Sequence, residues 1–310
     1  MKGVPELPDL ESYVEALRER VLGEPLLAVK VASPFLVRTA DPPLREVDGR
    51  RVEAVRRLGK RIVLGLEGEL FLALHLMIAG RLRWQESGGK KPSRTGKPLA
   101  TFEFPKGTLL LTEAGTKRRA ALHLLRGEAG LASLARGGLE PLEVDESAFA
   151  AALRRENHTL KRALTDPDLF AGIGNAYSDE ILHRARLSPV KLTSRLGDEE
   201  VSRLFAATRE VLGTWLARLQ TERAGAFPDQ VTAFRPDFAV HGRHRQPCPV
   251  CGAAVQRIVH AENETNYCPR CQTEGKILSD RSLARLLKDD WPRTVEELEQ
   301  RAGLGLKPAS

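Results

Sequence analysis

The residues with the clearest chemistry are four cysteines, all of which lie between positions 248 and 271. Cys248 and Cys251 form one Cys-x2-Cys pair, and Cys268 and Cys271 form a second pair, with sixteen residues between the two. Each pair presents two thiolates from a tight turn, and two such turns close a tetrahedron around Zn²⁺ without an open position. A closed site is structural, because it folds a segment too short to have its own core. The spacing predicts one structural zinc ion; two disulfides or a redox Cys-x-x-Cys are the alternatives.

A second candidate is the Gly-x-Gly-Asn sequence at residues 172–175, which directly precedes a helical pattern. Glycines at this point let backbone N–H groups approach an anion at the positive end of a helix, and Asn175 adds a side-chain donor. The same sequence is equally typical of a plain tight turn. Both interpretations stay open on spacing alone.

The elements that must position these residues follow from hydrophobic spacing. Apolar residues at helical spacing, with Pro8 in the first turn and Gly23 as a stop, predict a helix at the start of the chain. Residues 26–125 contain short alternating runs separated by turns, which is the pattern of a β-sandwich or barrel. Residues 88–96 are rich in glycine and basic residues and predict an exposed loop.

The second half of the chain is helical before the cysteines and again after them. After the breakers Gly137, Gly138 and Pro141, the chain carries apolar residues at helical spacing to about residue 223, and a connector at 227–236 contains proline. After the cysteine module we expect two short helices, at 280–288 and 294–302. The chain shows no internal repeat.

Composition limits the class of protein. The 310 residues are 42% hydrophobic and 29% charged, which is enough to bury a sizeable core. The net charge of +7 is weak evidence for a polyanionic partner, because a basic surface without such a partner has the same charge. The longest apolar run, residues 70–79, is too short to span a membrane, and the N-terminus has no signal-peptide pattern. We therefore expect an intracellular protein.

Three sequence elements occur in one specific order. They are Pro-Glu-Leu-Pro at residues 5–8, Gly-Ile-Gly-Asn at 172–175, and the cysteine module. Together they resemble the formamidopyrimidine-DNA glycosylase / endonuclease VIII (Fpg/Nei) family of base-excision repair enzymes, over residues 5 to about 273. The resemblance implies a multidomain α+β fold: an N-terminal β-sandwich with flanking helices, a helix–two-turn–helix domain and a C-terminal zinc-finger hairpin, with DNA held between the halves. The expected segments are the sandwich at 1–136, the helical domain at 137–226, the connector and zinc finger at 227–273, and a helical tail at 274–310.

The resemblance also implies an activity and the residues that carry it. The family excises oxidised bases and then cuts the abasic strand by β,δ-elimination. Carried over by position, Pro5 is the nucleophile, Glu6 the general acid/base and Lys60 a catalytic lysine. The positions that match DNA-binding residues or lie in DNA-binding loops are Lys161, Gly174, Asn175, Ile78, Arg118 and Arg119.

The implied partner is damaged double-stranded DNA. We expect a monomer with one structural zinc ion held by the four cysteines, without a nucleotide cofactor and without a membrane. The expected location is the cytoplasm of a bacterial-type cell, at the nucleoid when DNA is bound.

The chemistry agrees with these residue types. A secondary amine that attacks C1′ of the sugar gives an iminium ion, which acidifies the neighbouring C2′ hydrogens. A helix N-terminus and a lysine cation nearby both keep the amine of Pro5 in its free-base form. Glu6 is next in sequence, within reach to protonate the opening sugar and to move protons during elimination.

The start of the chain conflicts with this role for Pro5. Residues 1–4 precede it, and the nitrogen of a proline inside a chain is an amide that cannot attack C1′. We expect translation to begin at Val4, read from a GTG start codon, so that removal of the initiator residue exposes Pro5.

Other positions depart from the family pattern. Ile78 stands where the family has a methionine that fills the gap left by the extruded base, and residues 116–121 lack the aromatic of the corresponding loop. Asn263 replaces an arginine that grips the lesion phosphates, which predicts weaker binding at the lesion. Residues 223–240 lack the family's Gly-Gly-Thr-Thr loop.

Two further functions remain open. The first is a catalytically silent protein of the same fold that binds DNA lesions, which the blocked Pro5 and the substituted Asn263 favour. The second is a zinc-ribbon RNA-binding protein, which leaves Glu6 and Lys60 unexplained. The preferred lesion and the choice between duplex and single strand do not follow from the sequence.

Overall fold

A computed structural model of the 310-residue chain shows two compact units. The N-terminal unit comprises Met1–Gly138 and Leu212–Ala233, and the C-terminal unit comprises Leu139–Val211 and Phe234–Ser310. The structure describes residues 3–88, 97–114, 118–228, 235–260, 263–278 and 292–303. The predicted helix at 280–288 lies outside these ranges. The predicted basic loop at 88–96 also lies outside them, except for its first residue.

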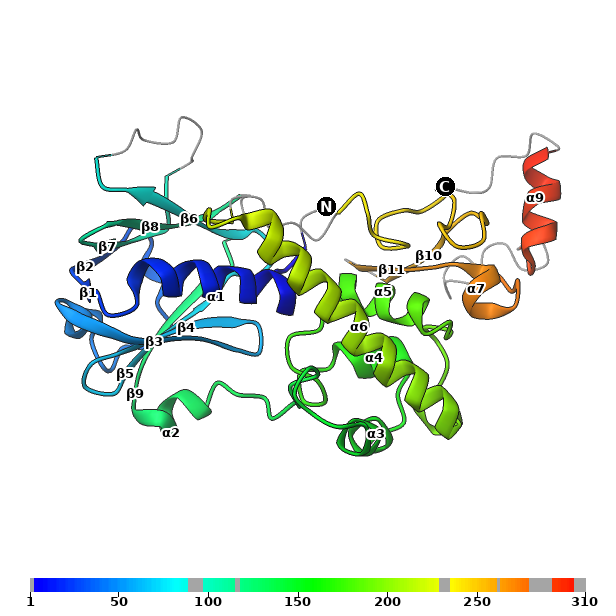
Figure 1. The fold of residues 1–310 in the computed structure, drawn as a ribbon, viewed down its shortest axis with the longest axis horizontal. Helices are drawn as coiled ribbons and strands as arrows, with labels where there is room; N and C mark the ends of the chain where they lie inside the picture. The colour runs from blue at the N-terminus through cyan, green and yellow to red at the C-terminus, as the bar shows by residue number, and fades with distance from the viewer. Residues whose placement is uncertain are drawn as a thin grey trace. The chain divides into compact units, whose positions relative to one another are not determined.

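Two antiparallel sheets form the N-terminal unit and confirm the predicted β-sandwich (Figure 1). The five-stranded sheet has the order β1-β3-β4-β5-β9, and the four-stranded sheet has the order β2-β7-β8-β6. The strands are β1 (Pro25–Leu26), β2 (Ala28–Val31), β3 (Arg50–Leu58), β4 (Arg61–Leu66), β5 (Leu70–His75), β6 (Gly80–Glu86), β7 (Ala100–Phe104), β8 (Gly107–Glu113) and β9 (Ala121–Arg126).

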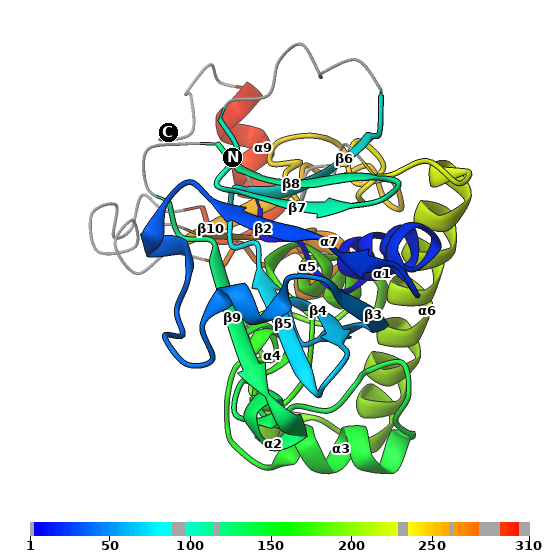
Figure 2. The same cartoon turned by 90° about the vertical axis from the view of Figure 1, so that its left-hand side faces the viewer.

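Helix α1 (Leu7–Val21) lies between the two sheets, as Figures 1 and 2 show. Its apolar side, with Leu10 and Leu17, belongs to the same buried cluster as Leu64 of one sheet and Phe102 of the other. The helix begins at the predicted place because Pro8, which has no N–H, fits the first turn, where N–H groups have no partner within the helix.

Strands β4 and β5 are buried on both faces, which explains why they are almost continuously apolar rather than alternating. One face contributes to the core between the sheets. The other face packs Val63, Phe71 and Ala73 against Leu131 of the short helix α2 (Gly127–Ala132).

The C-terminal unit confirms the predicted helical pattern and the cysteine hairpin. Helix α5 is central to it, because eight of its ten residues are buried. The boundary between the units falls within the long helix α6. The elements are α3 (Glu146–Arg154), α4 (Leu160–Thr165), α5 (Asn175–Arg184), α6 (Asp198–Arg223), β10 (Gln256–His260), β11 (Asn263–Tyr267), α7 (Pro269–Thr273) and α9 (Val295–Gly303).

The predicted tail helix at 294–302 is confirmed as α9. The segment that leads into α9 pairs with the end of the zinc module. Lys276 forms an antiparallel β-bridge with Thr294, and the Ile277 N–H donates to the Arg293 carbonyl at 2.8 Å. Arg270 of α7 also forms an ion pair of 3.2 Å with Glu299. Within the described ranges, no helix is both long enough and apolar enough to cross a membrane.

Candidate functional site

Pro5 and Glu6 lie where the chain enters α1, and both are buried. The Glu6 N–H donates to the Asp9 carboxylate at 3.1 Å, and the two residues form a capping box at the N-terminus of the helix. The Glu6 carboxylate is therefore held at the positive end of the helix dipole. Arg81, at the start of β6, donates to the Gly3 carbonyl at 3.4 Å, which places residue 3 beside the turn between β5 and β6.

Lys60 follows Gly59 in the two-residue turn that joins β3 to β4. Arg61, the next residue, pairs with His75 at the end of β5. The pKa of His75 is lowered to about 4, chiefly by burial and also by the charges of Arg61, Lys60 and His123. The Lys60 ammonium therefore lies close enough to the end of β5 to act on it electrostatically.

Ile78 lies on a tight turn directly after β5, where its side chain is 38% exposed. His75 Nδ1 accepts the Met77 N–H at 3.1 Å, and the Gly80 N–H donates to the Leu76 carbonyl at 2.9 Å. A Cβ at Gly80 would lie 2.1 Å from the Leu76 oxygen, so that only glycine fits. The turn is thus fixed from both ends and presents Ile78 to solvent.

Arg118 and Arg119 are exposed at the entrance to β9. The Glu113 carboxylate accepts the backbone N–H groups of Arg119 at 2.9 Å and of Ala120 at 3.3 Å. This carboxylate fixes the backbone at the base of the loop. Residues 115–117 lie outside the described part of the chain.

The C-terminal unit brings together Lys161, Gly174 and Asn175. Lys161 Nζ donates to the Asn175 carbonyl at 2.6 Å and to Asp179 Oδ1 at 2.5 Å. Gly174 is the N-cap residue of α5, and Asn175 Nδ2 donates to the Glu264 carbonyl at 2.9 Å. The helix start and the Asn175 amide are therefore tied to the hairpin β10–β11.

Two adjacent buried acidic residues of α5, Asp179 and Glu180, form hydrogen bonds with residues 239–241 and with the hairpin of the zinc module. Asp179 Oδ2 accepts the Asn266 N–H at 3.1 Å and lies 2.8 Å from His241 Nδ1. The Glu180 carboxylate accepts the three backbone N–H groups of residues 239–241 at 2.7 to 2.9 Å. Burial raises the pKa of Glu180 although these three N–H groups act in the opposite direction.

The four cysteine sulfurs come together as their spacing predicted. Cys248 Sγ lies 3.9 Å from Cys271 Sγ, and Cys251 Sγ lies 3.4 Å from Cys268 Sγ. Burial raises the pKa of the Cys271 thiol to about 11, so a divalent cation is needed to hold this sulfur as a thiolate at neutral pH. The thiol donor set fits one structural zinc ion.

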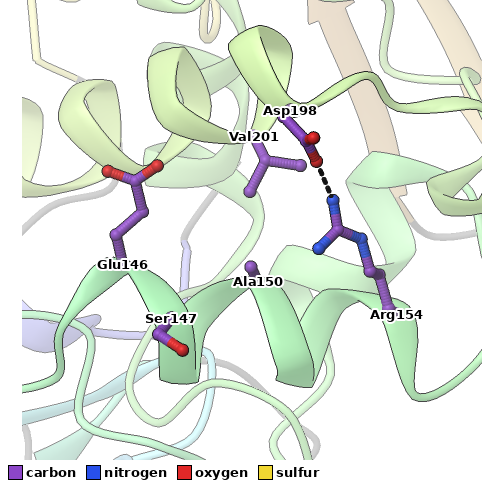
Figure 3. Close-up of a pocket in the computed structure, with 6 residues that line it drawn as sticks. All are labelled: Glu146, Ser147, Ala150, Arg154, Asp198 and Val201. Atoms are coloured by element: carbon purple, nitrogen blue, oxygen red, sulfur yellow. Dashed lines mark hydrogen bonds and ion pairs between the residues drawn. The ribbon is translucent and has the colours of Figure 1, made fainter.

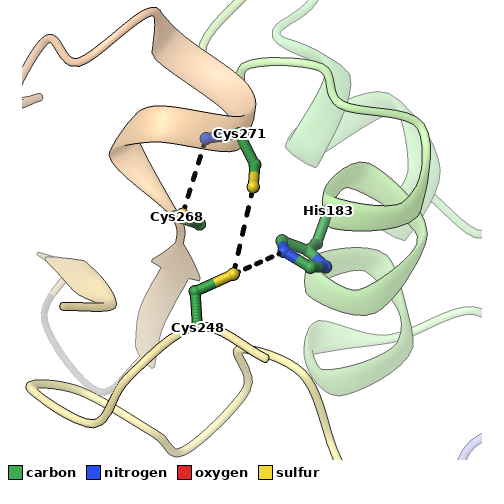
Figure 4. A group of neighbouring side chains, drawn as sticks. All are labelled: His183, Cys248, Cys268 and Cys271. Carbon is green, nitrogen blue, oxygen red and sulfur yellow. Dashed lines mark hydrogen bonds between the residues drawn. The ribbon is translucent and has the colours of Figure 1, made fainter. Parts of the chain in front are cut away.

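His183 of α5 is a fifth member of this group (Figure 4). Its Nε2 lies 3.3 Å from Cys248 Sγ. The sulfurs of Cys248, Cys268 and Cys271 and the imidazole all lie within 4.8 Å of one another. An imidazole N–H in this position donates to a thiolate and orients it.

Sequence reasoning missed Asp179, Glu180, His183 and His241. The signal that could have found the first three is their place in a helix whose other residues are mostly apolar. Such a helix is buried, so its polar side chains need partners inside the unit. His241 carries no comparable signal in the sequence.

A hollow on the C-terminal unit lies between α3 and α6 (Figure 3) and is crossed by an Arg154–Asp198 ion pair of 2.5 Å. None of the candidate residues lines it. The lining residues are Glu146, Ser147, Ala150, Arg154, Asp198 and Val201.

A sandwich, a helical unit and a zinc hairpin in this order define a class of zinc-finger DNA glycosylases, and three family models match them in turn. The formamidopyrimidine-DNA glycosylase N-terminal domain matches residues 4–119. The H2TH domain of the same enzymes matches residues 138–223. The zinc finger found in FPG and IleRS matches residues 245–273.

Curated relatives match over nearly their whole length. The formamidopyrimidine-DNA glycosylase of Thermus thermophilus is 35% identical over 285 residues, which cover 88% of this chain and 100% of that protein. The enzyme of the same name from Heliobacterium modesticaldum is 33% identical over 281 residues, which cover 87% of this chain and 100% of that protein. The chain therefore belongs to the formamidopyrimidine-DNA glycosylase family.

Solved structures agree. The crystal structure of the MutM (Fpg) protein of Thermus thermophilus has a TM-score of 0.73 and 34% identity, and the match covers 86% of this chain and 98% of that one. Lactococcus lactis Fpg, in complex with DNA that contains FAPY-dG, has a TM-score of 0.75 and 25% identity, with 86% of this chain and 100% of that chain covered.

Proposed function

We propose that this chain is a bifunctional DNA glycosylase and AP lyase of base-excision repair. It removes oxidised bases from damaged double-stranded DNA and cuts the abasic strand by β,δ-elimination. The observation that carries the proposal is the match over the whole length of named glycosylases, with Pro5 and Glu6 at the N-terminus of α1.

In this mechanism the Pro5 nitrogen attacks C1′ while the damaged base leaves with its electron pair and takes up a proton. The sugar ring opens, Glu6 protonates the ring oxygen, and an iminium ion remains between Pro5 and C1′. Loss of a C2′ proton expels the 3′ phosphate, and a second elimination expels the 5′ phosphate. Water then hydrolyses the imine and frees the amine.

The other candidate residues have roles in binding. Lys60 supplies positive charge beside the site, and Ile78 fills the gap that an extruded nucleotide leaves. Arg118, Arg119 and the group of Lys161, Gly174 and Asn175 bind phosphates. Cys248, Cys251, Cys268 and Cys271 hold the zinc ion.

The proposal includes four segments and a cellular location. The segments are the catalytic sandwich at 1–136, the helix–two-turn–helix domain at 137–226, the connector and zinc finger at 227–273, and the tail at 274–310. DNA as partner supports a cytoplasmic location, at the nucleoid when DNA is bound.

The chemistry requires that Pro5 begin the mature protein, because an amide nitrogen does not attack C1′. The N-terminal family model begins its match at residue 4, directly before Pro5. The intact mass of the protein from its native host tests this point directly.

Borohydride reduction on a duplex with one abasic site tests the function. Protein that begins at Pro5 is expected to form a covalent adduct, whereas protein that keeps residues 1–4 is not. Glu6→Gln in the first form is the matched variant and should slow strand cleavage. Equal adducts from both forms would exclude Pro5 as nucleophile.

A catalytically silent lesion-binding protein is the second candidate. It is favoured by Asn263, which is exposed at the start of β11 and carries no charge to grip the lesion phosphates. Absence of any adduct from protein that begins at Pro5, together with preserved binding of abasic DNA, would establish this alternative.

A further inference from the structure

Phe35 is 80% exposed, more than any other large hydrophobic side chain in the described ranges. It lies in a short 3-10 turn, Pro34–Leu36, whose last residue is buried in the core. Leu36 anchors the turn while the aromatic ring projects into solvent. A single exposed apolar residue is ordinary in itself, so the surroundings of the ring decide its meaning.

The turn lies beside the start of β9. Val37 forms a parallel bridge with Leu122, and the Arg38 N–H donates to the Leu122 carbonyl at 2.8 Å. The 3-10 turn Pro34–Leu36 also contacts β9, so Phe35 lies on a turn beside that strand. In Figure 2 the blue segment after β2 reaches the upper end of β9, where that strand begins.

The Ile78 turn flanks the same point from the other side. Strand β5 pairs with β9 so that His75 lies opposite Ala121, and Ile78 follows three residues later. The start of β9 therefore has the Phe35 turn on one side and the strand that leads into the Ile78 turn on the other. Two exposed apolar side chains therefore lie at one edge of the sheet.

This edge is basic. Arg118 and Arg119 are exposed at the entrance to β9. Arg38 is exposed three residues after Phe35, and its charge reaches His123 of β9, since it contributes to the lowered pKa of that residue. A basic surface with exposed aromatic and aliphatic side chains is the composition of surfaces that bind nucleic acid through both phosphates and bases.

We propose that Phe35 stacks on a base next to the extruded nucleotide, on the opposite side of β9 from Ile78. The proposal rests on the function proposed above, because it takes damaged DNA as the partner. An aromatic face stacks on any base without reading its sequence. Phe35 is therefore a positioning residue that holds the distorted duplex and takes no part in the bond changes.

The test measures binding to a duplex that contains a tetrahydrofuran abasic-site analogue, by fluorescence anisotropy at several salt concentrations. Phe35→Ala should weaken binding by about 5- to 100-fold, whereas Phe35→Trp should retain it. The slope of log affinity against log salt should not change, because no phosphate contact is lost. The melting temperature should stay at the wild-type value, since the ring is exposed.

Leu27→Ala is the matched control. Leu27 is 48% exposed in the same unit but precedes β2, at the end of that strand away from Phe35. Affinity of Phe35→Ala within about twofold of wild type, or an equal loss in Leu27→Ala, overturns the proposal. The analogue cannot pass through the imine chemistry of Pro5, so a protein that fails the borohydride test still gives a decisive result here.

Discussion

At the scale of single residues, Asp179 shows how one buried carboxylate sets the position of several groups. Its two oxygens contact Lys161, His241 and the backbone N–H of Asn266. The ammonium of Lys161 and the start of β11 are thereby fixed relative to α5. The phosphate-binding role proposed for Lys161 depends on this arrangement, because an unfixed lysine loses more side-chain entropy when it binds.

Asp179→Asn is expected to destabilise the protein by about 3 kcal/mol, because it leaves the largely buried Lys161 ammonium without its counter-charge. Urea unfolding measures the loss. Asp198→Asn is the control, since Asp198 is 94% exposed in its ion pair with Arg154 and its loss should have no measurable effect. Equal losses in both variants would contradict the structural role of Asp179.

His75 makes stability depend on pH. Its pKa is lowered from 6.5 to about 4, first by burial and then by Arg61, Lys60 and His123, so the folded state keeps it neutral as the acceptor of the Met77 N–H. Below its unfolded pKa the unfolded state binds the extra proton.

The free energy of unfolding should therefore fall by up to about 3 kcal/mol as the pH drops from 6.5, the pKa of His75 in the unfolded state, to about 4, its pKa in the folded state. Above pH 6.5, His75 should not make the free energy of unfolding depend on pH. Urea unfolding at a series of pH values measures the slope. His75→Gln keeps an acceptor but does not titrate, so its slope should be shallower in this range; an unchanged slope would assign the pH dependence to other groups.

At the scale of elements, α5 joins the two candidate features of the C-terminal unit. Its first residue carries the Asn175 amide, its middle carries Asp179 and Glu180, and its last turn brings His183 to Cys248. Because one short helix carries all of these side chains, the zinc hairpin and the proposed phosphate site share a common support.

His183→Leu is expected to release zinc about 10- to 100-fold faster to a competing chelator, because the Cys248 sulfur loses its N–H donor. His183→Gln keeps an N–H donor and should lie between the wild type and the leucine variant. The spectrum of the Co²⁺-substituted protein distinguishes an imidazole that donates a hydrogen bond to the Cys248 sulfur from an imidazole that binds the metal. Loss of a nitrogen from the first coordination shell in His183→Leu would show that the imidazole binds the metal itself.

At the scale of the whole molecule, each unit has its own buried core. The sandwich is closed by α1 and by both sheets, whereas the described residues around the cysteines form a small apolar cluster that includes the cysteines themselves. Metal binding is therefore part of the folding energy of the C-terminal unit alone.

Chelation of zinc should raise amide exchange at residues 239–241 and in β11, while β4 and β5 keep their protection. Hydrogen exchange with mass spectrometry measures both regions in one sample. The loss of protection should reverse when Zn²⁺ is returned. Unchanged exchange in β11 after complete removal of the metal would show that the hairpin folds without it.

Much of this protein is determined by the sequence alone, because the relevant physics is local. Two Cys-x2-Cys pairs define a zinc site from within four residues each, Pro8 and Gly23 delimit α1, and short apolar runs predict the sandwich strands. The sequence also predicts the turn at Gly174 before α5, but its spacing did not decide between an anion-binding site and a plain tight turn.

Only the tertiary structure decided which groups surround these features. The contact of Asp179 with His241 joins residues 62 apart in sequence, and that of His183 with Cys248 joins residues 65 apart. The position of Phe35 follows from a bridge between Val37 and Leu122. Local periodicity carries information over a turn or a strand, whereas these contacts arise from the packing of distant segments, which no pattern of neighbouring residues encodes.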